Sequence, residues 1–238
     1  MGRVTSLVVP PALSRWVAGI DRATASAAAA VDVPDHATTL VLRVARGGRR
    51  ELAVLGPRTR AGYHLGPPGR SCIRIRMRPG RVRALLGRPL GDLADRALPL
   101  GELPGLDLGE LAADPVAALE KALAGRPEPS ERLDEAVRLL ADGITVATTA
   151  ARLHISQRRL HTLFSEGTGL SPKYFARIDR VRTVLAEEVR GVGRWSEIAA
   201  TAGYYDQSHM TAEFRHFMGV PPAAFTAGRR PAPALCAG

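Results

Sequence analysis

Two stretches of the chain carry side chains whose types and spacing suit hydrogen bonding rather than covalent chemistry. In the first, a helix is predicted over residues 156–166, and a helical wheel places Arg158 and Thr162 on the side opposite its apolar residues. Arg159 and His161 flank these two residues. Guanidinium, imidazole and hydroxyl groups in this arrangement can contact base edges and phosphates. A face exposed only to solvent would more often carry Lys and Glu, so the pattern favours nucleic-acid recognition.

The second stretch has the same design over a helix predicted at residues 206–217. Met210 and Phe214 fall on its apolar side. The other side carries Ser208, His209, Thr211, Ala212 and Arg215. Each helix starts after a residue suited to capping, Ser156 in one and Asp206 in the other. A second capped helix with a polar face in the equivalent place strengthens the case for recognition.

The two helices belong to an internal repeat with a constant offset of fifty residues and no gap. The recurring pairs are Ala150 and Ala200, Ser156 and Asp206, Leu160 and Met210, Phe164 and Phe214, Gly169 and Gly219, Pro172 and Pro222, and Phe175 and Phe225. A repeat of this length indicates two copies of one supersecondary unit. In each copy a short helix, predicted over residues 148–154 and 196–202, precedes the capped helix across a tight turn, which is a helix-turn-helix pattern. Trp195, Tyr204 and Tyr205 are interpreted as packing residues.

A long helix is predicted between the two copies. Ser171 and Pro172 suit its start, its apolar stripe runs to Val189, and glycines stop it after Arg190. At ~1.5 Å per residue this helix would form a strut of ~25 Å, compared with ~34 Å between successive major grooves on straight DNA. The strut would therefore set the spacing of the two capped helices.

These residues resemble the DNA-binding domain of AraC-type transcriptional regulators, the AraC/XylS family. The resemblance covers about residues 131–226 and rests on two half-motifs in the family's order and spacing. The first half-motif comprises Ser156, Gln157, Arg158, Arg159, Leu160, Phe164, Gly169, Ser171, Pro172, Tyr174 and Phe175. The second comprises Ile198, Ala199, Ala202, Gly203, Tyr204, Asp206, Gln207, Ser208, His209, Phe214, Arg215, Gly219 and Pro222. The resemblance implies two helix-turn-helix units, joined by the long helix, that enter successive major grooves on one face of the duplex.

By position in the two recognition helices, the residues expected to contact DNA are Ser156, Gln157, Arg158, Arg159, His161, Thr162, Asp206, Gln207, Ser208, His209, Thr211 and Arg215. Ser156 and Asp206 are first of all N-caps. His209 either reads a base or packs against the neighbouring helix. Family members often carry Arg at the positions of Thr162 and Ala212, and Arg is the side chain best suited to bidentate contact with guanine. We therefore expect the first recognition helix, with its two arginines, to contribute more specificity than the second.

Residues 1–90 are predicted to form mostly β structure. The predicted strands are residues 38–44, 51–55 and 73–78. Gly47 and Gly48 suit a hairpin turn between the first two. In the third strand Arg74, Arg76 and Arg78 alternate with apolar residues, so one face is apolar and the other cationic. This row of arginines either faces solvent, which is the commoner outcome, or lines an anion site, and we assign no site to it.

The N-terminal half more loosely resembles the cupin-like β-rich sensory or dimerisation domains that precede the DNA-binding domain in many AraC-type regulators. The resemblance implies a domain that binds a small effector or a partner subunit. The effector-binding residues stay unknown, because no effector motif stands out. His36 and His64 lack the close spacing of a cupin metal site, so neither a metal nor another cofactor is expected.

The strongest linker in the chain lies at residues 125–129, where two prolines and a glycine resist both helix and sheet. We therefore expect an α+β protein in which a β-rich, cupin-like domain is followed by an all-α domain with two helix-turn-helix units joined by a long helix. The sensory or dimerisation domain is predicted at residues 1–125 and the DNA-binding domain at residues 130–228. Residues 229–238 are predicted to be a disordered tail.

Composition sets broad limits on the function. The formal net charge of +10 over 238 residues suits a polyanionic partner but does not locate the binding surface. Two cysteines indicate neither a disulfide framework nor a zinc site. The sequence contains no signal peptide and no apolar run of about 18 residues, so a cytoplasmic protein without membrane contact is expected. Expected partners are double-stranded DNA, RNA polymerase, a small-molecule effector and a second copy bound through the N-terminal domain.

The main hypothesis is a sequence-specific transcriptional regulator that is not an enzyme. The first alternative is a cupin-type metalloenzyme fused to a DNA-binding domain. Another is a DNA-repair regulator that uses Cys72 as an alkyl acceptor, although Cys72 lacks the neighbouring Pro, His and Cys residues that such chemistry needs. A non-specific nucleoid-type binder would show steep salt dependence without sequence preference.

Overall fold

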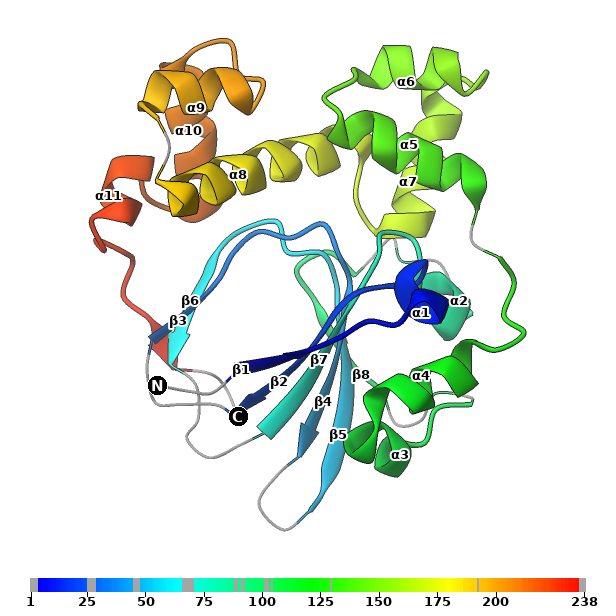
Figure 1. Ribbon diagram of the computed structural model, residues 1–238. Helices are drawn as coiled ribbons and strands as arrows, with labels where there is room; N and C mark the ends of the chain where they lie inside the picture. The colour runs from blue at the N-terminus through cyan, green and yellow to red at the C-terminus, as the bar shows by residue number, and fades with distance from the viewer. Residues whose placement is uncertain are drawn as a thin grey trace.

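The computed structural model describes residues 4–24, 29–44, 48–65, 71–87, 90, 93–100, 103, 105–128, 130–191 and 193–235. Strands gather in the N-terminal part, up to residue 128, and this part lies beneath a layer made by the helices of the C-terminal part, residues 130–228 (Figure 1). This arrangement confirms the expected α+β class, with a β-rich part before an all-α part.

The main sheet has six antiparallel strands in the order β1-β2-β7-β4-β5-β8. They are β1 (Val4–Leu7), β2 (Val17–Thr24), β4 (Thr39–Val44), β5 (Arg50–Leu55), β7 (Ser71–Met77) and β8 (Ala97–Leu100). The helices that pack on this sheet are α1 (Pro11–Ser14), α2 (Val82–Leu86), α3 (Leu108–Ala113) and α4 (Pro115–Leu123). One hydrophobic cluster joins sheet and helices and includes Trp16, Ile75 and Leu119. The predicted hairpin is confirmed by the pairing of β4 with β5, although Gly47 lies outside the described residues.

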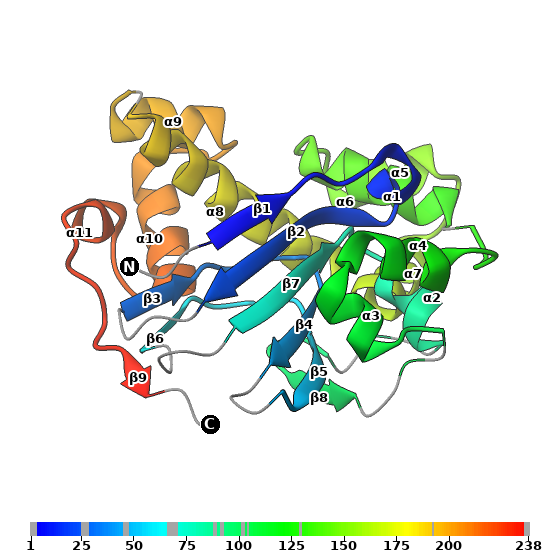
Figure 2. The same ribbon diagram turned by 60° about the horizontal axis from the view of Figure 1, so that its bottom comes forward.

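A smaller sheet contains β3 (Ala29–Asp32), β6 (Gly62–Leu65) and β9 (Ala234–Leu235). Strand β9 comes from the C-terminal end of the chain and pairs in parallel with β6 (Figure 2). The prediction of a disordered tail is therefore wrong for residues 229–235, because strand pairing holds β9 and the Arg230 guanidinium lies 4.6 Å from the centroid of the Phe225 ring. Cys236 and the last two residues lie outside the described part of the chain.

The row of arginines on β7 and directly after it contacts other parts of the protein. Arg74 lies 3.5 Å from the carboxylate of Asp32. Arg76 donates two hydrogen bonds to the carboxylate of Asp35, at 2.7 and 2.6 Å. Arg78 donates to a backbone carbonyl of α1 at 2.5 Å. Arg74 and Arg78 are exposed and Arg76 is half-buried, so this face is largely solvated, as the commoner alternative predicts, and each guanidinium group also contacts an acceptor of the protein.

The C-terminal part consists of seven described helices. They are α5 (Glu131–Ala141), α6 (Val146–Arg152), α7 (Gln157–Thr168), α8 (Pro172–Arg190), α9 (Trp195–Thr201), α10 (Gln207–Met218) and α11 (Pro222–Thr226). Side-chain oxygens cap five of them by accepting a backbone N–H in the first turn, and the capping residues are Ser130, Thr145, Ser156, Ser171 and Asp206. Each such cap stabilises its helix by about 1 kcal/mol. None of the described helices combines the length and the apolar character that crossing a bilayer requires.

Helix α8 provides the centre of the second hydrophobic cluster. It starts and ends where the sequence predicts, and it buries Phe175, Ile178, Val181 and Val184 completely. The predicted apolar stripe is wrong at its end, because the buried side continues through Val184 and leaves Val189 83% exposed. Since residues of α5, α7, α9 and α10 all pack in this cluster, α8 supplies core to both halves of the helical layer.

Candidate nucleic-acid interface

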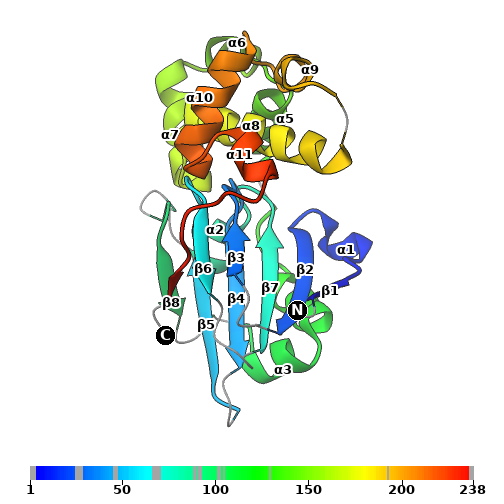
Figure 3. The same ribbon diagram turned by 90° about the vertical axis from the view of Figure 1, so that its left-hand side faces the viewer.

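Two similar helix pairs sit along α8. We call α6 with α7 the first unit and α9 with α10 the second unit. Figure 1 shows the two units separated along α8, and Figure 3 shows α7 and α10 on the same side of it. The second helix of each pair is twelve residues long. It follows a residue whose side chain caps it, and it is followed by a glycine with positive φ. Two equivalent helices therefore present their outer sides in one direction.

The turns of the two units differ by one residue. In the first unit the N–H of Ile155 donates to the carbonyl of Ala150 at 3.0 Å, and in the second the N–H of Tyr204 donates to Ala199 at 2.9 Å. Ala150 is therefore equivalent to Ala199 and not to Ala200, so the prediction of a repeat without a gap is wrong. The offset is 49 residues up to the turn and 50 from the helix caps onward. Tyr205 is the additional residue.

Tyr205 does not pack as predicted. Its relative exposure is 93%, whereas Tyr204 beside it is only 6% exposed and belongs to the hydrophobic cluster. Ile155, the residue before the cap in the first unit, packs against the same cluster. The prediction of a packing role is confirmed for Tyr204 and wrong for Tyr205, because the additional residue places the Tyr205 ring in solvent directly before the cap of α10.

The first unit exposes most of the residues that the sequence selects. Gln157, Arg158, Arg159 and His161 are exposed on α7. The hydroxyl of Ser156 accepts the N–H of Arg159 at 3.1 Å, as its role as a cap requires. Thr162 is half-buried and donates its hydroxyl to the carbonyl of Arg158 at 3.2 Å, so the helix itself uses this donor. The available donors of α7 are therefore mainly guanidinium and imidazole groups.

The second unit exposes a weaker set of donors. Gln207, Ser208 and Arg215 are exposed on α10, Thr211 is half-buried, and Ala212 is exposed between them. The carboxylate of Asp206 accepts the N–H of His209 at 2.7 Å. The ring of His209 also contacts the ring of Tyr204 edge-on, at 5.3 Å between centroids, so packing accounts for part of its environment.

A buried carboxylate that the sequence does not predict holds α10 against α8. Glu213 is 6% exposed, and its two oxygens accept from Arg177 at 2.7 Å and from Arg180 at 2.7 and 3.2 Å. The guanidinium of Arg177 also lies 5.1 Å from the centroid of Phe217. The signal in the sequence is a charged residue at a position on the apolar side of α10, where the first repeat has Leu163.

These contacts determine the ionisation of Glu213. Burial alone would raise the pKa of its carboxyl, but hydrogen bonds and charge from Arg177 and Arg180 lower the pKa below its usual value. Tyr204 lies in the same cluster, where burial and the charge of Glu213 raise the pKa of its hydroxyl. Glu213 is therefore charged at neutral pH, and it fixes the orientation of α10 on α8 through ion pairs.

Comparison with known proteins identifies the two units. A protein-family model described as a helix-turn-helix domain matches residues 149–228. This region is an AraC-type helix-turn-helix domain. A curated relative, an uncharacterized HTH-type transcriptional regulator YidL of Escherichia coli (strain K12), is 34% identical over 83 residues, which cover 34% of this chain and 27% of the relative. The chain thus spans about a quarter of the length of that relative.

Solved structures with a similar arrangement include two transcriptional regulators. The DNA-binding domain of AdpA, a global transcriptional factor solved in complex with a target DNA, is 26% identical at a TM-score of 0.37, with 41% of this chain and 88% of that chain covered. ToxT from Vibrio cholerae is 10% identical at a TM-score of 0.49, with 95% of this chain and 98% of that chain covered.

The ion pairs of Glu213 lead to a test of stability and its pH dependence in the AraC-type domain. Because Gln cannot neutralise two half-buried guanidinium groups, Glu213→Gln should lower the free energy of unfolding by about 2 kcal/mol at pH 7. The folded-state pKa of Glu213 is below its ordinary value of 4.5, so its contribution is present above that pH and disappears as the pH falls further. Urea unfolding of wild type and variant should therefore converge towards low pH.

Glu135→Gln is the matched control, because Glu135 forms an ion pair with Arg138 on the surface of α5. Its effect at pH 7 should be much smaller than that of Glu213→Gln, because an ion pair on the surface contributes little to stability. Equal losses in the two variants would show that the pairs of Glu213 contribute no more than surface pairs.

The two adjacent tyrosines should respond differently to truncation. Tyr204→Ala removes a buried ring and should cost roughly 3 kcal/mol of stability. Tyr205→Ala removes an exposed ring and should leave the thermal unfolding midpoint unchanged. A large loss of stability in Tyr205→Ala would contradict the exposed position of this side chain.

Proposed function

We propose that the protein is a sequence-specific DNA-binding transcriptional regulator that inserts α7 and α10 into successive major grooves. The observation that carries this proposal is the pair of capped helices in the AraC-type domain, which lie on one side of α8 (Figure 3) and expose guanidinium, imidazole and hydroxyl groups. The match of the helix-turn-helix family model to residues 149–228 and the curated relative described as an HTH-type transcriptional regulator support it.

The length of α8 fits this mode of binding. Its 19 residues span roughly 28 Å at ~1.5 Å per residue. Successive major grooves lie ~34 Å apart on straight DNA, and the width of each unit or a modest bend in the duplex accounts for the difference. One chain can then read an asymmetric site without a symmetric dimer.

Different parts of the interface have different roles in this proposal. Arg158 and His161 on α7, with Ser208 and Arg215 on α10, are the candidates for base contacts, and Ala212 limits the second unit to an apolar contact such as a thymine methyl. The proposed interface also includes Gln157, Arg159, Thr162, Gln207, His209 and Thr211. Ser156 and Asp206 place the first N–H groups of their helices towards phosphates. The exposed ring of Tyr205 adds a further contact to this proposed interface.

The N-terminal part has a separate role in the proposal. It would bind a small-molecule effector or a second copy of the chain and change how the AraC-type domain engages DNA and RNA polymerase. The proposed division is residues 1–125 for this domain and residues 130–228 for DNA binding. A cytoplasmic location follows from the proposed function.

The metalloenzyme alternative is less well supported. In the ranges that the structure describes, no three His, Cys, Asp or Glu side chains gather as a metal site would require. The two histidines of the N-terminal part each lie beside a different aspartate: His36 lies 3.2 Å from Asp179, and His64 lies 3.8 Å from Asp32. Burial raises the pKa of Cys72, which opposes the thiolate that an alkyl acceptor needs. We therefore propose that the protein is not an enzyme.

Selection of bound sequences from a random DNA pool, repeated at two salt concentrations, tests the proposal. The protein should enrich an asymmetric motif of two parts spaced by about one helical turn. Enrichment of no motif, with binding that only falls as salt rises, would instead identify a non-specific binder.

The two units should contribute unequally to specificity. Arg158→Ala removes an exposed guanidinium and should lower the preference for the selected site by about 1–3 kcal/mol, because a bidentate contact with guanine is worth that much. Ser208→Ala should cost less. Competition binding against a site with a scrambled half measures the preference of each variant, and equal losses would contradict the asymmetry but not DNA binding.

A further inference from the structure

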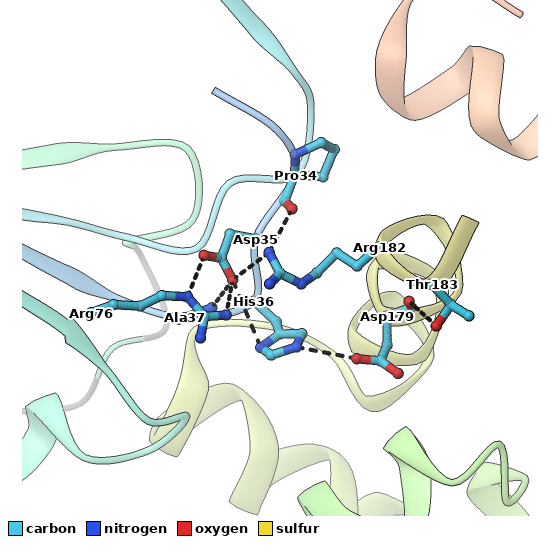
Figure 4. A network of polar contacts seen from close by, with 8 residues as sticks. All are labelled: Pro34, Asp35, His36, Ala37, Arg76, Asp179, Arg182 and Thr183. Atoms are coloured by element: carbon cyan, nitrogen blue, oxygen red, sulfur yellow. Dashed lines mark hydrogen bonds and ion pairs between the residues drawn. The ribbon is translucent and has the colours of Figure 1, made fainter. Parts of the chain in front are cut away.

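The N-terminal part holds the middle of α8 through a short segment at residues 34–36 (Figure 4). Arg182 of α8 lies 3.3 Å from the carboxylate of Asp35 and 3.4 Å from the carbonyl of Pro34. One turn earlier on α8, Asp179 lies 3.2 Å from the Nε2 atom of His36. The segment therefore contacts a basic and an acidic residue of the same helix.

The contact is built on a rigid base. The carboxylate of Asp35 also binds Arg76 of β7, at 2.7 and 2.6 Å, and accepts the N–H of Ala37 at 3.0 Å. Burial alone would raise the pKa of Asp35, but Arg76 and then Arg182 lower it, so the group is charged at neutral pH. The ring of His36 stacks on Phe175 of α8 at 4.5 Å between centroids. The main sheet thus positions the carboxylate that Arg182 contacts.

The same part of the chain also binds the C-terminal end of each recognition helix. The N–H of Leu90 donates to the carbonyl of Glu166 in α7 at 3.0 Å. The N–H of Ala61 donates to Phe217 in α10 at 2.8 Å, and the hydroxyl of Tyr63 donates to Met218 at 2.6 Å. The last carbonyls of a helix lack partners within the helix, so these donors satisfy groups that would otherwise face water.

From these contacts we infer that the N-terminal part acts as a splint, meaning a rigid support that fixes the relative position of the two recognition helices. Asp35 and His36 are its positioning residues on α8. The inference deepens the proposed function, because it assigns a physical task to the N-terminal part at the same DNA interface. Three contacts on one body, at the end of α7, the middle of α8 and the end of α10, restrict the angle between the units more than α8 alone.

The exposure of the recognition faces sets the direction of the effect. Arg158 and His161 on α7 and Ser208 and Arg215 on α10 are all exposed while the N-terminal part is docked. Docking therefore leaves the proposed DNA surface open. Since a two-groove site requires both helices at a fixed separation, a loosened splint should weaken binding to the full site more than binding to one half. A ligand or partner that shifts residues 34–36 would act on DNA binding through this contact.

Arg182→Gln in the full-length chain tests the inference, with Arg190→Gln as its matched control. Both variants remove one positive charge from α8, so their long-range attraction to DNA falls equally. Among the described residues, Arg190 pairs within its own helix, with Glu187 at 2.6 Å. Relative to this control, Arg182→Gln should weaken binding to the full selected site by roughly fivefold or more. Binding to a site with one scrambled half should be equal in the two variants.

A second measurement needs no DNA and separates failure of the splint from failure of the proposed function. Arg182→Gln should speed amide hydrogen exchange in the peptides that cover residues 34–37 and 172–190, whereas Arg190→Gln should not change residues 34–37. A double-mutant cycle with Asp35→Asn should show coupling between residues 35 and 182 in the exchange of both peptides.

The outcomes distinguish the possibilities. If the exchange changes as expected but the wild type selects no DNA motif, the splint exists and the proposed function is wrong. If both variants bind the full site equally, the N-terminal part does not position the helices. Tighter binding by Arg182→Gln would also overturn the inference, because docking would then inhibit rather than support DNA binding.

Discussion

The structure of the helical layer depends on the burial of α8. Its apolar side places Phe175, Ile178, Val181 and Val184 in the cluster that also contains the cores of both units. Phe175 contacts Phe164 of α7 edge-on at 5.3 Å and stacks with His36 of the N-terminal part. Because interiors are packed closely, neither unit can rotate about α8 without repacking this shared core. The spacing of the two recognition helices is thus set by a core, and the polar contacts act on an arrangement that packing already limits.

At equivalent positions, the second helices of the two units pack through side chains of different chemistry. On α7 the position equivalent to Glu213 is Leu163, which packs against the cluster as an apolar side chain. On α10 the carboxylate of Glu213 replaces it and pairs with two arginines of α8. An ion pair with several hydrogen bonds restricts orientation more than an apolar contact does, because its energy depends on angles as well as distance. The unit with fewer exposed donors is therefore the one whose orientation is more strongly fixed.

The sequence predicts the local features of this fold well. Ser156, Ser171 and Asp206 cap helices as expected, and the bounds of α8 are correct, because capping and helical periodicity depend on neighbours within a few residues. Long-range features were missed. Strand β8, which pairs with β5, is flanked by glycines and prolines, so the sequence shows no clear strand pattern there. Strand β9 pairs with β6, a strand far away in the sequence. Arg76 of β7 and Arg182 of α8 meet at Asp35, which lies between β3 and β4, and no spacing in the sequence indicates such a meeting.

The additional residue in the second turn shows why a repeat in sequence differs from a repeat in structure. Residues 199 and 200 are both alanine, so the composition allows Ala150 to align with either, and the apolar positions after the turn favour the alignment without a gap. Only the backbone hydrogen bonds of the turns, from Ile155 to Ala150 and from Tyr204 to Ala199, decide between the two. A turn tolerates one more residue because it lies at the surface and its neighbours keep their hydrogen bonds. The packing of the unit does not use the ring of Tyr205, so this ring is available for contact with another molecule.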